Sequence, residues 1–198
     1  MPGRTGKYSR RTAETTVQVE LDLDGSGRHQ VDTGNGMLDH LLSQVSRHGL
    51  IDLTVSARGD THVGWHHLVE DTGIVMGRAL KEAVGDGRGI VRMGHAYVPL
   101  DEALALVVVD FGGRGYAVLD MEVGDSDMGG LPGDLLRHFL ESLAREGAFN
   151  LHVRLLAGIN NHHKAEAVFK ALGRALRAAL AQDPRSPGQV PSTKGSLG

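Results

Sequence analysis

The 198-residue sequence contains no cysteine. Disulfide bonds and thiolate metal sites are therefore excluded, and imidazole and carboxylate groups remain as the side chains that can bind a transition metal. No apolar run approaches the roughly 20 residues that a membrane-spanning helix needs. The net charge of −3 provides no basic surface for nucleic acid, and the polar segment Met1–Arg11 is not typical of a secretory signal. These absences favour a cytoplasmic enzyme that acts on a small molecule, with no membrane or nucleic acid among its partners.

Histidine and glycine are abundant instead, with 11 and 28 residues. Several histidines fall in two copies of one motif, His-His-x-x-Glu. Residues four apart on a helix share a face, so the first histidine and the glutamate of each copy can bind one ion together. The second histidine lies about 100° further around the helix and points toward another ion. The two copies are His66-His67-Leu-Val-Glu70 and His162-His163-Lys-Ala-Glu166.

An internal repeat places the two copies in equivalent positions. The segment Asp39–Leu53 resembles Arg137–Leu151, 98 residues later, and the paired histidines of the two motifs are 96 residues apart. A nearly constant offset indicates a duplicated unit with a pseudo-two-fold relation. We therefore expect the two motif helices to exchange ligands. Each ion would receive the histidine–glutamate pair of one helix and the second histidine of the other.

His40 and His138 are matched by the same repeat and are the natural additional ligands. Three imidazoles and one carboxylate would leave positions of an octahedral ion open for substrate, as catalysis requires. A lone histidine on an apolar helix is more often a core residue, and ferritin-like storage bundles also bind metal through Glu and His on helices. The strand-rich segments argue against such a bundle.

The hydropathy pattern predicts the same order of elements in both halves, and thus an α+β fold. We expect mostly antiparallel strands, with the two helices of each half packed on one sheet face. Residues 1–90 would form the first half, 91–182 the second, and 183–198 a tail whose Pro, Ser and Gly content is typical of disorder. The whole chain would be one functional domain. Expected strands are 15–23, near 30, 50–57, 103–109, 116–121 and 149–156, and expected helices are 37–47, 66–84, 133–146 and 162–182.

Three parts of the chain carry weaker signals for a phosphate group. The segment Pro191–Gly195 contains two hydroxyls, a cation and a flexible glycine, which suits a phosphate, although such residues are common in tails. Arg92 and Arg114 lie on Gly-rich turns, where they could bind an anion or simply be exposed. Glu14, which precedes a predicted strand, is by itself an ordinary surface carboxylate.

An ordered set of motifs runs along the chain in the segments Arg11–Thr15, Thr33–Gln44, His66–Asp71, Pro99–Leu104, His138–Ser142, Gly158–Lys170 and Pro191–Gly195. Together they resemble the imidazoleglycerol-phosphate dehydratase family over nearly the whole chain. The resemblance implies a duplicated α+β unit of the ribosomal protein S5 domain 2-like type, and homo-oligomeric shells of 24 subunits with sites at subunit interfaces. It also implies two manganese ions, one held by His40, His67, His162 and Glu166 and the other by His66, Glu70, His138 and His163.

The implied reaction is a hydro-lyase step of histidine biosynthesis, the dehydration of D-erythro-imidazole-glycerol phosphate to imidazole-acetol phosphate. Our hypothesis is that both ring nitrogens of the substrate bind metal, so that the ring becomes an imidazolate and expels the adjacent hydroxyl. Glu14 is the candidate acid/base. A dinuclear metallohydrolase such as a phosphatase, and a metal-storage or structural shell, are the alternatives. Substrate contacts implied by the resemblance are Glu14, Gln44, His48, Arg92, Arg114, Lys170, Ser192, Thr193 and Lys194.

Overall fold

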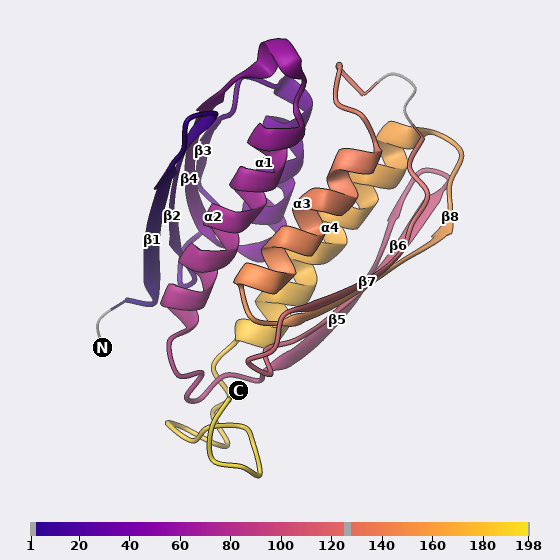
Figure 1. Ribbon diagram of the computed structural model, residues 1–198. Coiled ribbons are helices and arrows are strands. Elements are labelled where there is room, and N and C mark those ends of the chain that lie inside the picture. Colours follow the sequence, from indigo (N-terminus) through magenta and orange to yellow (C-terminus); the bar gives the residue numbers. More distant parts are fainter. Residues whose placement is uncertain (1–2, 125–127, 198) are drawn as a thin grey trace.

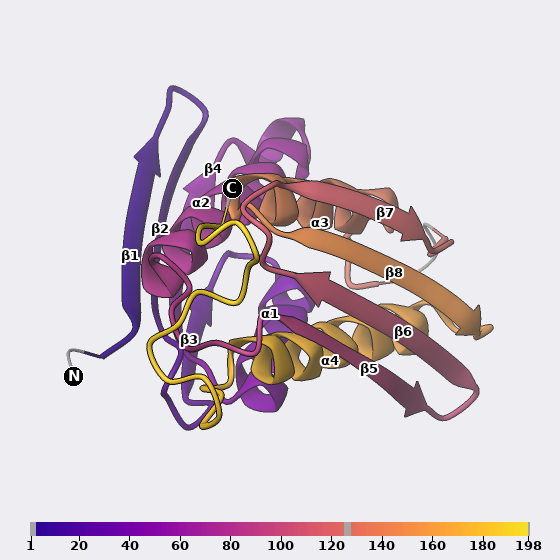
Figure 2. The ribbon, with the colours of Figure 1, turned by 90° about the horizontal axis from the view of Figure 1, so that it is seen from below.

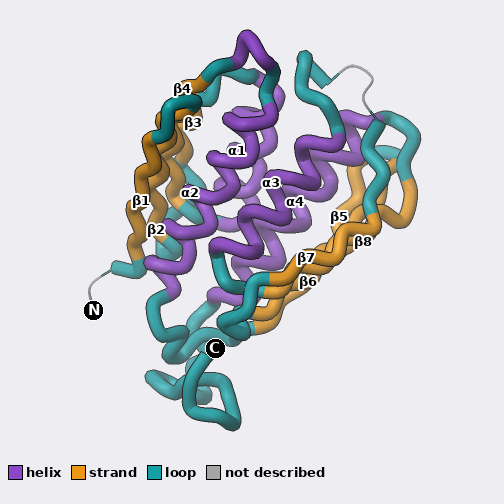
Figure 3. Tube along the Cα trace, viewed as in Figure 1, coloured by secondary structure: helices purple, strands orange, loops and turns teal. Residues whose placement is uncertain are grey.

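The computed structural model describes residues 3–124 and 128–197, which form two four-stranded sheets with four helices between them (Figures 1 and 3). Each half contributes one sheet and the two helices that cover its inner face, as the repeat predicts. The first half comprises β1 (Thr5–Arg11), β2 (Thr15–Asp22), β3 (His29–Asp32), α1 (Gly36–Gly49), β4 (Asp52–Gly59) and α2 (His66–Val84). The second comprises β5 (Met93–Leu100), β6 (Ala103–Asp110), β7 (Tyr116–Asp120), α3 (Asp134–Glu146), β8 (Asn150–Ala157) and α4 (Asn161–Leu180).

The two sheets have the same topology. Their strand orders are β1-β2-β4-β3 and β5-β6-β8-β7, and all neighbouring strands are antiparallel except for the last pair in each sheet. The predicted α+β class and duplicated unit are therefore confirmed. The division at residues 90 and 182 falls between elements, where Ile90 and Gln182 form an isolated β-bridge.

Two strands, β1 and β5, are absent from the sequence prediction. Both are edge strands with a glycine at the second position, Gly6 and Gly94. A β-carbon at Gly6 would lie 1.9 Å from the carbonyl oxygen of Ala79, and one at Gly94 would lie 2.4 Å from that of Ala175. Each strand thus passes so close to a helix that its second residue, which faces the helix, must be glycine. Glycine at this inward position weakens the alternation of apolar and polar residues that indicates a strand.

The helices of the two halves pack in crossed pairs, α1 with α4 and α2 with α3. Glycines allow the backbones to approach closely: a β-carbon at Gly173 would lie 2.7 Å from Val45 O, and one at Gly77 would lie 2.7 Å from Leu143 O. Gly77 and Gly173 are repeat equivalents, so the pseudo-two-fold is preserved at both contacts. Because His40 and His162 both lie near the starts of their helices, this packing brings them together.

The C-terminal tail is held against the loop between α2 and β5, although its composition alone is typical of disorder (Figure 2). Gly89 N–H donates to Gln189 O over 2.7 Å, and the Arg92 guanidinium donates to Pro191 O over 2.9 Å. These contacts depend on partners about 100 residues away, which composition does not reveal. None of the helices in the described part of the chain is long and apolar enough to cross a membrane.

Candidate active site

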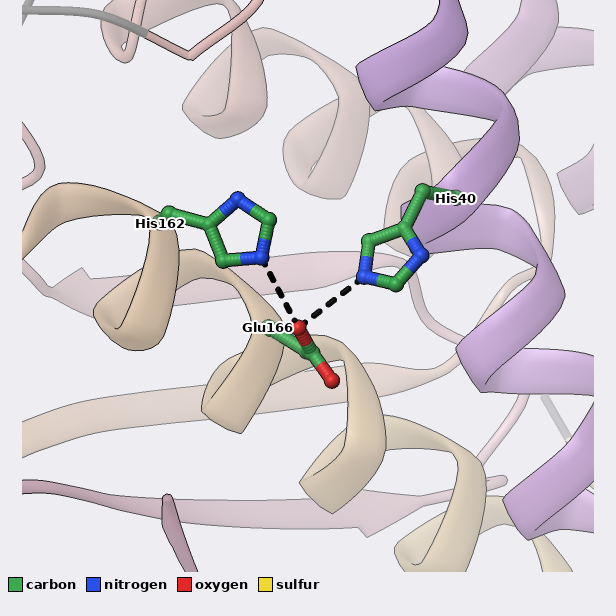
Figure 4. Close-up of side chains that lie close together, drawn as sticks. All are labelled: His40, His162 and Glu166. Carbon is green, nitrogen blue, oxygen red and sulfur yellow. Dashed lines mark hydrogen bonds and ion pairs between the residues drawn. The ribbon is translucent and has the colours of Figure 1, made fainter. Parts of the chain in front are cut away.

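One cluster of imidazole and carboxylate groups lies between α1 and α4 (Figure 4). Asn35 and Asn160 cap the starts of the two helices through their side chains, which fixes where His40 and His162 emerge. His40 Nε2 and His162 Nε2 lie 2.9 and 3.0 Å from the same oxygen, Oε2 of Glu166. Three ligand atoms therefore converge within reach of one ion.

Glu166 is the buried member of this cluster, with a side chain that is 12% exposed. Burial alone would raise its pKa, but hydrogen bonds from Lys170 and His40 lower the pKa to about 2. The carboxyl is therefore ionised at neutral pH and offers two acceptor oxygens. Lys170 Nζ occupies the other oxygen at 2.6 Å. Imidazole nitrogens with one anionic oxygen are a donor set that suits Mn²⁺, Zn²⁺ or Fe²⁺.

A second group lies at the equivalent contact between α2 and α3. His66 Nε2 is 3.8 Å from Glu70 Oε2, and the rings of His66 and His138 have centroids 4.7 Å apart. Three of the four predicted ligands of each ion thus lie close together. Each group of three contains the first histidine and the glutamate of one motif, with His40 or His138 as the third member.

The second histidines of the motifs, His67 and His163, do not join these groups within one chain. His67 Nδ1 lies 3.1 Å from Asp60 Oδ2, and His163 Nδ1 lies 2.8 Å from Glu102 Oε2. These carboxylates raise the pKa of both histidines, mainly through the hydrogen bond. Among the described residues, the ligand exchange between motif helices is therefore not made inside a single chain.

The predicted substrate residues separate into two sets. At the end of the molecule where α1 and α4 begin, Gln44 Nε2 is 3.5 Å from His40 Nδ1. His48 lies near Lys170, and its pKa is lowered by burial and by the charges of Lys170 and Arg174. Glu14, in the turn between β1 and β2, places Oε2 3.8 Å from His67 Nδ1.

The other set lines a cavity of about 520 Å³ beside the C-terminal tail. The Arg92 guanidinium donates two hydrogen bonds to Asp110 there, of 2.7 and 3.1 Å. The backbone of Arg92 has a φ of 77°, in the left-handed region. The cavity brings together the predicted anion-binding residues Arg92, Arg114, Ser192, Thr193 and Lys194. Cations and hydroxyls in this arrangement can bind a phosphate group.

The length of α4 separates the two sets. The Arg92 N–H donates to Ala179 O near the end of α4, whereas His162 lies at its start. Seventeen residues at 1.5 Å each place these positions about 25 Å apart. The separation is far greater than the length of a three-carbon chain that carries an imidazole and a phosphate.

Asp60 and Glu102 are site residues that sequence reasoning missed. Neither has a matching acidic residue at the offsets of 96 and 98 residues that relate the predicted ligands, and each lies in a loop outside the motif helices. Glu102 does fall within the family motif segment Pro99–Leu104, so the sequence marks this segment but does not indicate what Glu102 contacts.

Comparison with known proteins places this geometry in a family. A model of the imidazoleglycerol-phosphate dehydratase family matches residues 33–176. An imidazoleglycerol-phosphate dehydratase of Dehalococcoides mccartyi is 53% identical over 197 residues, which cover 100% of this chain and 99% of the relative. The chain belongs to the imidazoleglycerol-phosphate dehydratase family.

Other members of the imidazoleglycerol-phosphate dehydratase family agree in sequence and in fold. The dehydratase of Chloroflexus aggregans is 54% identical over 194 residues, covering 98% of this chain and 95% of that one. The crystal structure of the Pyrococcus furiosus enzyme in complex with (S)-C348 has a TM-score of 0.82 at 37% identity, covering 96% of this chain and 99% of that chain. The Staphylococcus aureus enzyme gives 0.80 at 33% identity, with coverages of 90% and 99%. Imidazoleglycerol-phosphate dehydratases are hydro-lyases, so the family fixes the reaction class.

Proposed function

We propose that this member of the family converts D-erythro-imidazole-glycerol phosphate to imidazole-acetol phosphate with two manganese ions at each active site. The convergence of two Nε2 atoms on one oxygen of Glu166 is the observation that carries the metal proposal. His40, His162 and Glu166 would hold one ion, and His66, Glu70 and His138 would hold the other. Bound in this way, the ions would supply Lewis-acid activation of the substrate imidazole. A cytoplasmic location is part of the proposal.

The remaining residues have roles that follow from their positions. Glu14 is 55% exposed and able to exchange a proton with the substrate chain, which suits an acid/base. Gln44, His48 and Lys170 would orient the substrate beside the first ion. The cavity lined by Arg92, Arg114 and Ser192–Lys194 would hold the phosphate group, which fixes the chain relative to the metals.

We further propose that each active site is built from more than one copy of the chain, in an assembly of 24 subunits. The separation of about 25 Å along α4 supports this, because one chain cannot present its metal end and its phosphate end to the same substrate. The contacts of His67 with Asp60 and of His163 with Glu102, outside the ligand groups of their own chain, support it as well. A neighbouring copy could supply these two histidines as the fourth protein ligands.

One assay tests the reaction and the metal requirement. Metal-free protein would be incubated with imidazoleglycerol phosphate, with and without Mn²⁺, and both the ketone product and inorganic phosphate would be measured. We expect ketone to form only with Mn²⁺. Release of phosphate would instead identify a dinuclear metallohydrolase, and the absence of both products would favour a metal-storage or structural shell.

A further inference from the structure

Glu102 in the turn between β5 and β6 makes contacts with two different partners. Its Oε1 accepts the backbone N–H groups of Ile159 and Asn160, at 3.0 and 2.7 Å, and so holds the loop that leads into α4. Its Oε2 lies 2.8 Å from His163 Nδ1. One carboxylate therefore links the β5–β6 turn, the start of α4 and the second histidine of the second motif.

Glu102 is the repeat equivalent of Glu14. Strand register aligns the two hairpins, since Thr5 pairs with Asp22 in the first and Met93 pairs with Asp110 in the second. Both members of each pair are 88 residues from their counterparts, as are Glu14 and Glu102. The same offset relates Gly6 to Gly94, which make equivalent contacts with α2 and α4.

The two equivalent glutamates have diverged in what they contact. In the first half Asp60 contacts Nδ1 of His67 at 3.1 Å, and Glu14 remains 3.8 Å from the same atom. In the second half Glu102 makes the short contact with His163 itself. Glu14 thus lies too far from His67 for a hydrogen bond, whereas Glu102 is hydrogen-bonded to His163.

We propose that Glu102 is a positioning residue that holds His163 with the proton on Nδ1, so that the lone pair of Nε2 is available to a metal ion. A carboxylate only accepts hydrogen bonds, so the nitrogen facing it must donate. Histidine ligands of metals commonly donate their other ring N–H to a carboxylate in this way, which fixes the tautomer and the orientation of the ring. The inference rests on the proposed function, because it takes His163 to be a manganese ligand.

Glu102→Gln separates this role from a structural one. The carbonyl oxygen of glutamine can still accept the N–H groups of Ile159 and Asn160, but its NH₂ group then faces His163. An amide NH₂ donates, which favours the tautomer with the proton on Nε2 and blocks that nitrogen as a ligand. Glu20→Gln is the matched control, because it removes one carboxylate from the exposed surface of β2 in the other sheet.

The experiment titrates the metal-free full-length variants with Mn²⁺ and follows free Mn²⁺ by electron paramagnetic resonance, with thermal unfolding measured on the same metal-free samples. We expect Glu102→Gln to bind one of the two Mn²⁺ equivalents about 10–100-fold more weakly, while its thermal midpoint stays close to that of the wild type. Co²⁺ in place of Mn²⁺ should show an altered visible spectrum for that same equivalent. Glu20→Gln should behave as the wild type in every measurement.

Two results would overturn the inference in distinguishable ways. Wild-type binding of both equivalents by Glu102→Gln would show that Glu102 only holds the loop before α4. Failure of the wild type itself to bind Mn²⁺ would refute the metal proposal, and the positioning role with it.

Discussion

At the residue scale, the site depends on which ring nitrogen of each histidine lies where an ion would bind. His40, His66 and His162 direct Nε2 toward a glutamate, while His67 and His163 have Nδ1 against a carboxylate. In the first three, an ion would lie between Nε2 and the glutamate and would displace any proton on that nitrogen. In the last two, Nδ1 is engaged, which leaves Nε2 as the possible ligand atom, and Nε2 of His163 lies 3.7 Å from Asp101 Oδ2. A uniform choice of nitrogen indicates that the rings are oriented by their surroundings before an ion binds, which lowers the cost of ordering them on binding.

Glu14→Gln should abolish turnover without affecting the metals. Glutamine is nearly isosteric but cannot exchange a proton, so we expect kcat to fall by about 10²–10⁴-fold while the Mn²⁺ content stays unchanged. Steady-state kinetics and metal analysis of the same samples would check this. Normal turnover in Glu14→Gln would remove this residue from the mechanism.

At the scale of elements, the sequence predicts the four helices and most of the strands. The α2 bounds of His66–Val84 agree with the prediction, and Gly85, with a φ of 59°, ends the helix as expected. The approach of His40 to His162 and Glu166, and of His66 to His138, could be predicted because the repeat displays these residues twice. The edge strands β1 and β5 could not, because their inward glycines are required by helices that come much later in the chain.

Gly173→Ala should destabilise the protein by forcing α1 and α4 apart. The new β-carbon would meet the Val45 carbonyl at 2.7 Å, and overpacking of this kind costs about 1–3 kcal/mol. Gly36→Ala is the control, since Gly36 lies at the start of α1 and a β-carbon added there would have nothing within 4 Å. Urea denaturation of both variants would measure the difference, and equal stabilities would contradict the close packing described for these helices.

At the scale of the whole molecule, the candidate site residues lie at two opposite ends. The two ligand groups lie near the starts of α1 and α4 and of α2 and α3, and the cavity with Arg92 and Lys194 lies where α4 finishes. The sequence predicts both groups of residues but not their places, because the position of a helix relative to the tail depends on contacts between distant parts of the chain. Their separation is what makes an assembly part of the proposed function.

Two inactive variants should therefore restore activity when they are combined. His162→Ala damages the metal end and Lys194→Ala damages the phosphate end, and each alone should have little activity. Co-expressed in equal amounts, they should form mixed assemblies in which about a quarter of the sites draw both intact ends from different copies. Recovery of activity in the purified mixed assembly is the measurement. A mixture as inactive as its components would mean that each site is formed by a single chain.

The placement of these groups at opposite ends of α4 has a consequence for inheritance. In an assembly whose sites draw their two ends from different copies, a subunit that folds well but has lost one end inactivates one site, and its intact end still serves a neighbour. In an equal mixture with the normal subunit, about half of the sites would therefore stay active. A subunit that fails to fold never enters the assembly and also leaves about half of the sites, so the two kinds of lesion would cost a cell with one normal copy the same activity.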